Sequence, residues 1–145
     1  MLRVVFDTNL FVSCLLVKNG LPAQALDAWR AHRFLLVTSP AIMAEVSATL
    51  GYERIRRKYG VTDEDVDQLL ELLAADAVIV PGQSDVAGSV PDDVDDEIVL
   101  SCAVDGQVNV VVSGDQHLLA LGTFRGIDII TIRQFMERLP FSRQE

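Results

Sequence analysis

The sequence predicts a three-layer α/β/α protein, in which helices cover both faces of a mostly parallel sheet of about five strands. Three observations predict this α/β fold class. Short, continuously apolar runs, typical of buried strands, alternate along the chain with segments of helical periodicity. This alternation favours right-handed crossover connections and hence parallel strands. Neither an internal repeat nor a low-complexity linker divides the 145 residues, so we expect one domain spanning residues 1–145.

Composition limits the class of protein further. Half of the residues are hydrophobic (50%), enough for a real core. No apolar run approaches the roughly 20 residues of a membrane span, and the first strand begins too early for a signal peptide. We therefore expect a cytoplasmic protein without a membrane contact. Cys14 and Cys102 lie in apolar helical patterns and predict buried, reduced thiols, while His32 and His117 are isolated, so no zinc site is indicated.

Capping and turn residues divide the first half of the chain into its elements. We predict strands at residues 2–6 and 34–37, and helices at residues 10–17, 22–29, 40–50 and 52–59. Thr8 and Asn9 are good capping residues for the first helix. Pro22 suits the first turn of the second helix, and Ser39 before Pro40 is a cap followed by a proline.

The second half of the chain shows the same punctuation. We predict strands at residues 77–80, 108–112 and 127–130, and helices at residues 62–73, 94–105, 117–121 and 133–139. Thr62 followed by Asp65 is a strong helix start, and Gly60 and Gly106 end the helices before them. Residues 81–93 form the longest irregular stretch.

Acidic residues follow the first and the fourth predicted strands. These residues are Asp7 and Asp115. In a doubly wound sheet the two strands are neighbours at the switch point, where ligands bind, so the two carboxylates should converge. Taken alone, Asp7 fits the role of a turn or helix-cap residue equally well.

Two more acidic positions belong to predicted helices. Glu45 lies beside the apolar face of its helix, where a charged group is usually extended to solvent or paired. The run at residues 92–97 opens the helix before the fourth strand, where acids complement the helix dipole. The dipole does not explain where these acids lie around the helix. Asp92 and Asp96 are spaced i, i+4 and share a line with Val99, which packs inward.

A cluster of carboxylates favours a bound cation. Clustered carboxylates raise one another's pKa unless a cation neutralises them. Oxygen donors suit a hard ion, Mg²⁺ or Mn²⁺, which polarises a phosphoryl group and activates water. The net charge of −9 argues against nonspecific nucleic-acid binding, but a bound metal reverses the local field. The implied chemistry is metal-assisted phosphodiester hydrolysis.

Four motifs, covering nearly the whole chain, resemble those of the PIN-domain nucleases, which have a Rossmann-like fold. They are Asp7-Thr8-Asn9, Glu45, Asp96 ahead of Ile98-Val99-Leu100, and Ser113-Gly114-Asp115. Within this family, the chain looks most like the single-domain, VapC-like bacterial PIN proteins classed as toxins of toxin–antitoxin pairs. The resemblance rests on the acid-rich segment, on Val111 to Asp115 and on Leu118-Leu119.

This resemblance implies an endoribonuclease that uses Mg²⁺ or Mn²⁺, forms a homodimer and has an antitoxin protein as a partner. The implied catalytic acids are Asp7, Glu45, Asp96 and Asp115, with Asp7, Asp96 and Asp115 as metal ligands. The implied supporting residues are Asn9, Ser113 and Asp92. The residues themselves do not separate Asp95 from Asp96, and the family pattern favours Asp96. The chain departs from the pattern at His117, where many relatives carry an acid.

One dense basic group accompanies these acids. It consists of Arg54, Arg56, Arg57 and Lys58, in the helix after the one with Glu45. We predict that it forms part of the RNA path, and a solvated helix face is the alternative. Trp29, Phe34 and the helix at residues 52–59 are candidate dimer contacts.

Other functions for an α/β fold find less support. A response-regulator receiver domain needs an Asp after the third strand, where this chain has Val80-Pro81-Gly82. A haloacid-dehalogenase-type phosphatase needs an Asp at the position of Asn9. No glycine-rich phosphate loop with Lys-Ser or Lys-Thr is present. The alternative from another class is a non-catalytic binding module whose acidic site is unused.

Overall fold

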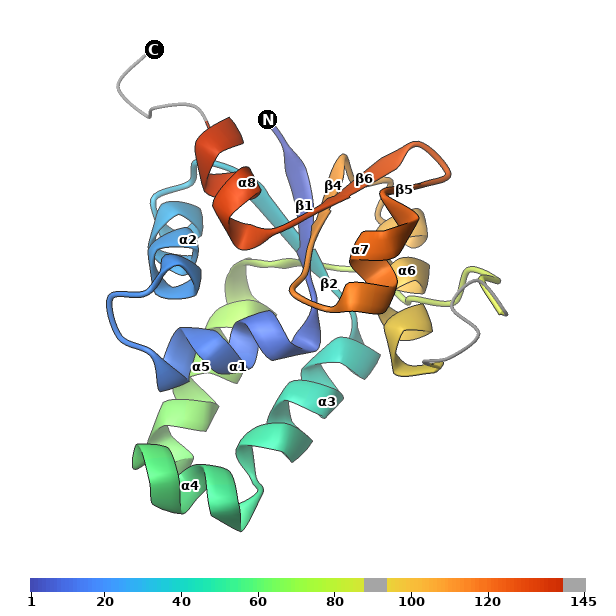
Figure 1. The fold of residues 1–145 in the computed structure, drawn as a ribbon. Coiled ribbons are helices and arrows are strands. Elements are labelled where there is room, and N and C mark those ends of the chain that lie inside the picture. Colours follow the sequence, from blue (N-terminus) through green and yellow to red (C-terminus); the bar gives the residue numbers. More distant parts are fainter. Residues whose placement is uncertain (88–93, 140–145) are drawn as a thin grey trace.

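The structure, a computed structural model, describes residues 1–87 and 94–139, with the backbone alone described at Val94 and Asp95. Its centre is a six-stranded sheet of order β3-β2-β1-β4-β6-β5, with helices around it (Figure 1). Every neighbouring pair of strands is parallel except β5 and β6. The predicted α/β class with a mostly parallel sheet is therefore confirmed.

The element bounds follow the predicted order. The strands are β1 (Arg3–Phe6), β2 (Leu35–Thr38), β3 (Val78–Ile79), β4 (Val110–Val112), β5 (Thr123–Phe124) and β6 (Ile127–Ile130). The helices are α1 (Thr8–Leu16), α2 (Leu21–Arg30), α3 (Pro40–Leu50), α4 (Glu53–Tyr59), α5 (Asp63–Asp76), α6 (Val94–Asp105), α7 (Gln116–Leu121) and α8 (Ile132–Arg138).

Two local predictions differ from the structure. The first helix begins at Thr8 rather than at residue 10, and of the candidate caps its N-cap is Asp7 rather than Thr8 or Asn9. Strand β5 was missed because it has two residues, too few for a pattern. It pairs with β6 through the two-residue turn Arg125-Gly126, in which both residues have positive φ (51° and 83°).

Helices cover both faces of the sheet. On one face, the Phe6 ring of β1 lies 6.1 Å from the ring of Phe135 in α8, within a cluster of aromatic rings. On the other face α6 contacts β1 and β2. Its end comes so close to β2 that a Cβ on Gly106 would lie 2.6 Å from Cγ1 of Val37. Val37 pairs with Val5, the neighbour of Phe6 on β1, and therefore points away from the Phe6 face.

Burial decides which predicted contacts are available at the surface. Trp29 and Phe34, candidate dimer residues, are 5% and 1% exposed and belong to the core. Tyr52 and Tyr59, at the two ends of α4, are 58% and 41% exposed. Cys14 and Cys102 are free and buried, as predicted. No helix in the described part of the chain has both the length and the apolar character that crossing a bilayer requires.

The strand register positions one edge of the sheet for function. Phe6 of β1 pairs with Val112 of β4, so the residues that follow them, Asp7 and Ser113, emerge side by side. The Asp7 N–H donates to the Val112 carbonyl at 3.1 Å. Helix α3 packs against α1 and α6, which brings two more elements to this edge.

Candidate active site

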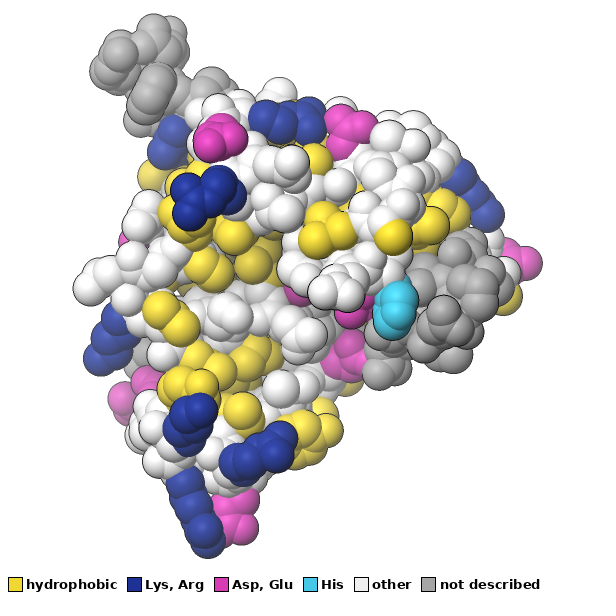
Figure 2. Space-filling view, in the orientation of Figure 1, with side chains coloured by type: hydrophobic (Ala, Val, Ile, Leu, Met, Phe, Trp, Pro, Cys, Tyr) yellow, Lys and Arg dark blue, Asp and Glu magenta, His cyan; other side chains and the backbone are white. Residues whose placement is uncertain are grey.

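The four predicted acids line one recess at the carboxyl end of the sheet. Asp7, Glu45, Asp96 and Asp115 surround a hollow of about 380 Å³, together with Asn9. They come from four places: the end of β1, helix α3, helix α6 and the start of α7. Figure 2 shows acidic side chains gathered in a depression on this face, with a histidine at its edge.

Asp7 is buried and held by two donors. Its Oδ1 accepts the Leu10 N–H at 2.9 Å, which caps α1, and its Oδ2 accepts the Ser113 hydroxyl. Burial raises the pKa of Asp7 above its ordinary value and the charge of Asp115 adds to this, although the Ser113 and Leu10 hydrogen bonds oppose it. Asp7 is thus both the helix cap and a wall of the recess.

Asp115 caps the next helix and is linked to Asp7 through one hydroxyl. Ser113 Oγ accepts the Asp115 N–H at 2.9 Å, and Asp115 Oδ1 accepts the N–H groups of His117 at 2.8 Å and Leu118 at 3.2 Å. Partial burial acts to raise the pKa of Asp115, but hydrogen bonds from the Asp96 carboxyl and from these N–H groups lower it. The net pKa of Asp115 is below its ordinary value, so this carboxylate is ionised at neutral pH.

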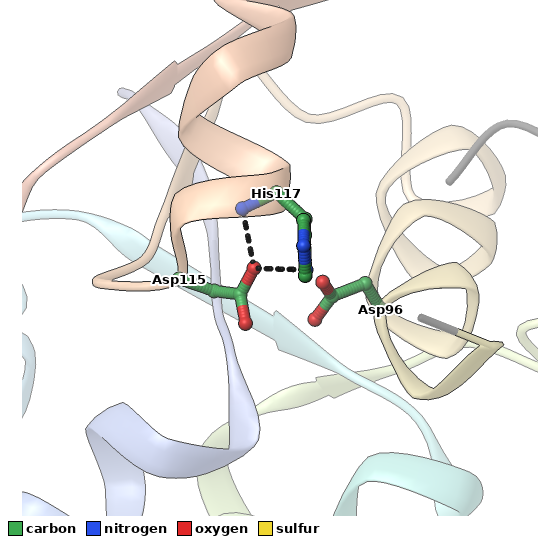
Figure 3. Close-up of side chains that lie close together, drawn as sticks. All are labelled: Asp96, Asp115 and His117. Carbon is green, nitrogen blue, oxygen red and sulfur yellow. Dashed lines mark hydrogen bonds and ion pairs between the residues drawn. The ribbon is translucent and has the colours of Figure 1, made fainter. Parts of the chain in front are cut away.

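Asp96 and His117 complete the cluster. Asp96 is 8% exposed and projects from α6 toward Asp115 (Figure 3). One ligand atom from each of Asp96, Asp115 and His117 lies within 4.8 Å of the others. His117 had no predicted role, because it stands where many relatives carry an acid. Its position two residues after Asp115, in the first turn of α7, was the signal that could have found it.

Glu45 is oriented by a residue that sequence reasoning did not single out. The hydroxyl of Thr8, the first residue of α1, donates to Glu45 Oε1 at 2.8 Å. The half-buried Glu45 side chain therefore has a fixed direction at the wall of the recess. Glu45 is therefore paired, as the local pattern predicted, and its catalytic role stays a prediction.

Two predicted positions cannot be compared with the structure. Asp92 lies outside the described residues, as does the side chain of Asp95. Of the adjacent pair Asp95 and Asp96, Asp96 is the one whose described side chain lines the recess. Asn9 also lines it and is exposed, and its supporting role stays a prediction.

A second hollow adjoins the first across the acids. It has a volume of about 600 Å³ and shares Asp7, Asn9 and Asp115 with the acidic recess. Ser13 and Thr131 line its far part. The carboxylates therefore stand between two adjoining hollows, an arrangement that suits an extended ligand whose middle is the reacting group.

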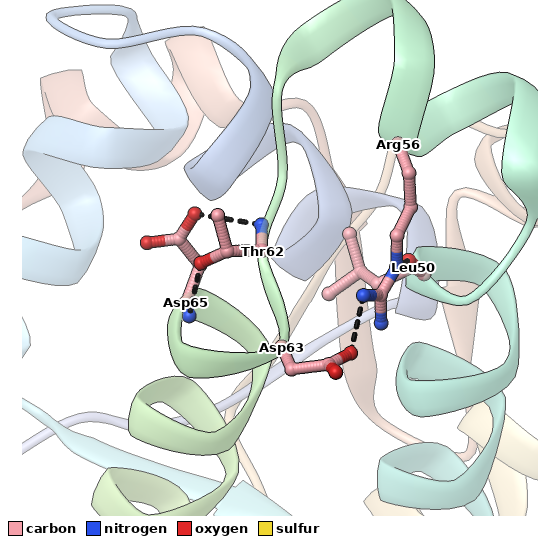
Figure 4. Close-up of polar contacts among 5 residues, drawn as sticks. All are labelled: Leu50, Arg56, Thr62, Asp63 and Asp65. Atoms are coloured by element: carbon pink, nitrogen blue, oxygen red, sulfur yellow. Dashed lines mark hydrogen bonds and ion pairs between the residues drawn. The ribbon is translucent and has the colours of Figure 1, made fainter.

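The basic group on α4 is partly structural. Arg56 donates to the Leu50 carbonyl at 2.9 Å and pairs with Asp63, which ties α3 to α5 beside the Thr62–Asp65 capping box (Figure 4). Arg57 pairs with Glu53 within α4. Arg54 and Lys58 are exposed, and Figure 2 shows basic side chains over α4 on the same face as the acidic depression.

The donor set fits a divalent cation. One carboxylate oxygen each of Asp96 and Asp115 and one imidazole nitrogen of His117 lie within 4.8 Å of one another, and divalent cations bind donors of these types. Burial is the main cause of the raised pKa of Asp7 and the charge of Asp115 adds to it, and a bound cation would offset both effects. Fold and site together define an α/β protein with an acidic, metal-competent centre at the switch point of its sheet.

Comparison with known proteins gives the family. A family model described as the PIN domain matches residues 3–117. The chain belongs to the PIN-domain family, whose nucleases are hydrolases that act on nucleic acids, typically with a divalent metal. The predicted family is confirmed.

Two individual proteins are similar to this chain. It is 27% identical over 120 residues to Uncharacterized protein MJ1680 from Methanocaldococcus jannaschii. The matched segment covers 83% of this chain and 75% of that relative. Its fold is similar to a chain in the crystal structure of VapBC2 from Rickettsia felis bound to a DNA fragment from their promoter. That match has a TM-score of 0.60 and 11% identity, and covers 89% of this chain and 98% of the other. At this identity the likeness concerns the fold.

Proposed function

We propose that this protein is an endoribonuclease that depends on Mg²⁺ or Mn²⁺, with residues 1–145 forming a single PIN-like nuclease domain. One observation carries the proposal: four acids from four separate elements line one recess. A structural role for each acid alone would not bring all four to the same hollow. Membership of the PIN-domain family supports the same reaction class.

The acids have distinct roles in this proposal. Asp7, Asp96 and Asp115 hold the ion, which when bound polarises a phosphoryl oxygen and lowers the pKa of an attacking water. Asp7 needs no reorganisation, because Leu10 and Ser113 already fix both of its oxygens. Glu45, whose direction Thr8 fixes, accepts the proton of the attacking water.

The RNA strand crosses the acids from one hollow to the other. Asp7, Asn9 and Asp115 line both hollows, which supports a position of the scissile phosphate at the carboxylates. Arg54 and Lys58 contact flanking phosphates, whereas Arg56 and Arg57 act mainly through their protein partners. RNA rather than DNA as the substrate follows from the resemblance to PIN toxins.

Two protein partners belong to the same proposal. The likeness in fold to a chain of VapBC2, with the resemblance to PIN toxins, supports an antitoxin protein that binds this chain. We also propose a homodimer, in which the exposed Tyr52 and Tyr59 are the candidate contacts, because Trp29 and Phe34 are buried. Light scattering at micromolar concentration should give twice the chain mass, and a monomer alone would contradict the dimer.

Cleavage of labelled single-stranded RNA tests the function. The purified protein should cut RNA in Mg²⁺ or Mn²⁺ and stop when EDTA is added, and matched DNA should be cut less. Equal cleavage with and without EDTA would refute the proposal. Metal binding without cleavage would instead support a non-catalytic binding module.

A further inference from the structure

An imidazole stands beside the carboxylates of the proposed metal site. The ring of His117 lies next to the Asp96 and Asp115 side chains, which point toward it from α6 and from the start of α7 (Figure 3). Its Nδ1 is 3.7 Å from Asp115 Oδ1, and its side chain is 51% exposed. The nitrogen therefore faces the acids from the open side of the recess.

These separations are close to those of ligands around one ion. With metal–ligand bonds of about 2.1 Å in an octahedron, neighbouring donor atoms are about 3 Å apart and opposite ones about 4.2 Å. The donor atoms of Asp96, Asp115 and His117 lie within 4.8 Å of one another. The His117 side chain is 51% exposed, so its ring has room to rotate toward the carboxylates.

We propose that His117 is a ligand of the bound ion and makes the site prefer Mn²⁺ to Mg²⁺. This inference rests on the metal site of the proposed function. Mg²⁺ binds oxygen donors almost exclusively and keeps its waters, whereas Mn²⁺ stands on the series in which imidazole nitrogen adds affinity. An oxygen-only site made by the acids alone would not discriminate in this way.

The backbone around His117 makes the inference testable without disturbing the fold. The His117 contribution to the Asp115 cap is its backbone N–H, which any side chain at this position retains. His117→Asn therefore removes the imidazole and keeps the helix start, and His117→Asp replaces nitrogen with a carboxylate. His32 is the matched control, because it lies in the left-handed region (φ 63°), which Asn tolerates.

Ion binding should be measured by calorimetry for wild type, His117→Asn, His117→Asp and His32→Asn. We expect His117→Asn to raise the Kd for Mn²⁺ about tenfold or more, with the Kd for Mg²⁺ nearly unchanged. His117→Asp should make the Kd values for Mn²⁺ and Mg²⁺ more similar, and His32→Asn should bind both ions as wild type does. An unchanged Kd for Mn²⁺ in His117→Asn would overturn the inference.

A spectroscopic reading separates direct ligation from an indirect effect. Electron spin echo measurements on bound Mn²⁺ should show coupling to an imidazole nitrogen in wild type and in His32→Asn, and no coupling in His117→Asn. Absence of the coupling in wild type that does bind Mn²⁺ would overturn this inference and leave the proposed function intact. A wild-type protein that binds neither ion would overturn both.

Discussion

The two ends of the sheet use the same kind of residue in opposite ways. At the amino end, Asp105 at the end of α6 accepts the Ser84 hydroxyl and the Gln83 N–H, and these hydrogen bonds lower its pKa. At the carboxyl end, Asp7 lies buried near Asp115 and its pKa is raised. Asp105 is satisfied by the protein, whereas the charges at the acidic recess are crowded.

This difference separates structural from functional acids. A lone carboxylate whose oxygens accept hydrogen bonds stabilises the fold as an ion. Acids that crowd one recess cost stability as ions, so a fold retains them where a ligand compensates for the cost. Helix α6 contains acids of both kinds, since Asp96 lies near its start and Asp105 at its end.

The largest expected effect is the difference in RNA cleavage between variants that lack an acid at the carboxyl end of the sheet and one that lacks an acid at the amino end. We expect Asp96→Asn or Asp115→Asn to lower RNA cleavage by at least about 100-fold, because loss of a direct ligand costs more than loss of its supporting groups. Asp105→Asn should leave kcat unchanged and lower the Tm. The comparison would fail if Asp105→Asn abolished cleavage or if Asp96→Asn spared it.

The serine hydroxyls that bind these acids should also have different roles: the one at the carboxyl end of the sheet should support metal binding, and the one at the amino end should support stability alone. Ser113→Ala removes the group that donates to Asp7 and accepts from Asp115, so the Kd for Mn²⁺ should rise about 10-fold to 100-fold. Ser84→Ala should lower the Tm slightly through loss of the hydrogen bond to Asp105 and leave the Kd unchanged. Calorimetry and thermal melts of both variants check this, and a loss of metal affinity in Ser84→Ala would contradict it.

A smaller effect, on RNA binding, is expected from the basic residues of α4. Reversing Arg54 and Lys58 to Glu should weaken RNA binding about tenfold. The slope of log Kd against log salt concentration should fall by about 1.4, because two contacts to single-strand phosphates are lost. The control reverses Lys18 and Arg30, which have the same charge and lie outside α4. Equal slopes in the two double variants would show that α4 is only a solvated face.

The sequence predicted what the strand register controls. Parallel pairing of β1 with β4 fixes which residues leave the sheet together, so the meeting of Asp7 and Asp115 followed from chain order. The inward line of Asp96 and Val99 on α6 followed from helical spacing, and both are buried. Periodicity was sufficient for these features.

Contacts between distant elements had no such signal. The Thr8–Glu45 hydrogen bond joins α1 to α3, and the Arg56–Asp63 pair joins α4 to the start of α5. His117 reaches Asp96 because α6 and α7 both begin at this edge, which is a fact of packing rather than of pattern. The cap of α1 was left open among Asp7, Thr8 and Asn9, because all three residue types have good capping propensities, and the structure has Asp7 in this role.

The central claim is that the acids form a metal site rather than scaffolding, and Asp7→Asn tests it. Asn keeps an oxygen for the Leu10 N–H and removes the buried charge. Because the folded pKa of Asp7 is raised, wild type loses stability relative to the variant as pH rises from the ordinary carboxyl pKa of about 4 to the folded value. Above that value the difference stays constant.

Thermal melts of wild type and Asp7→Asn, each in EDTA and in excess Mn²⁺ at neutral pH, give the decisive measurement. In EDTA the variant should be as stable as wild type or more stable. At 100 times the Kd, Mn²⁺ should stabilise wild type by about 2.7 kcal/mol, and the variant should lose most of that gain. A variant that melts lower in EDTA and keeps the full metal shift would show that Asp7 is scaffolding and would contradict the account.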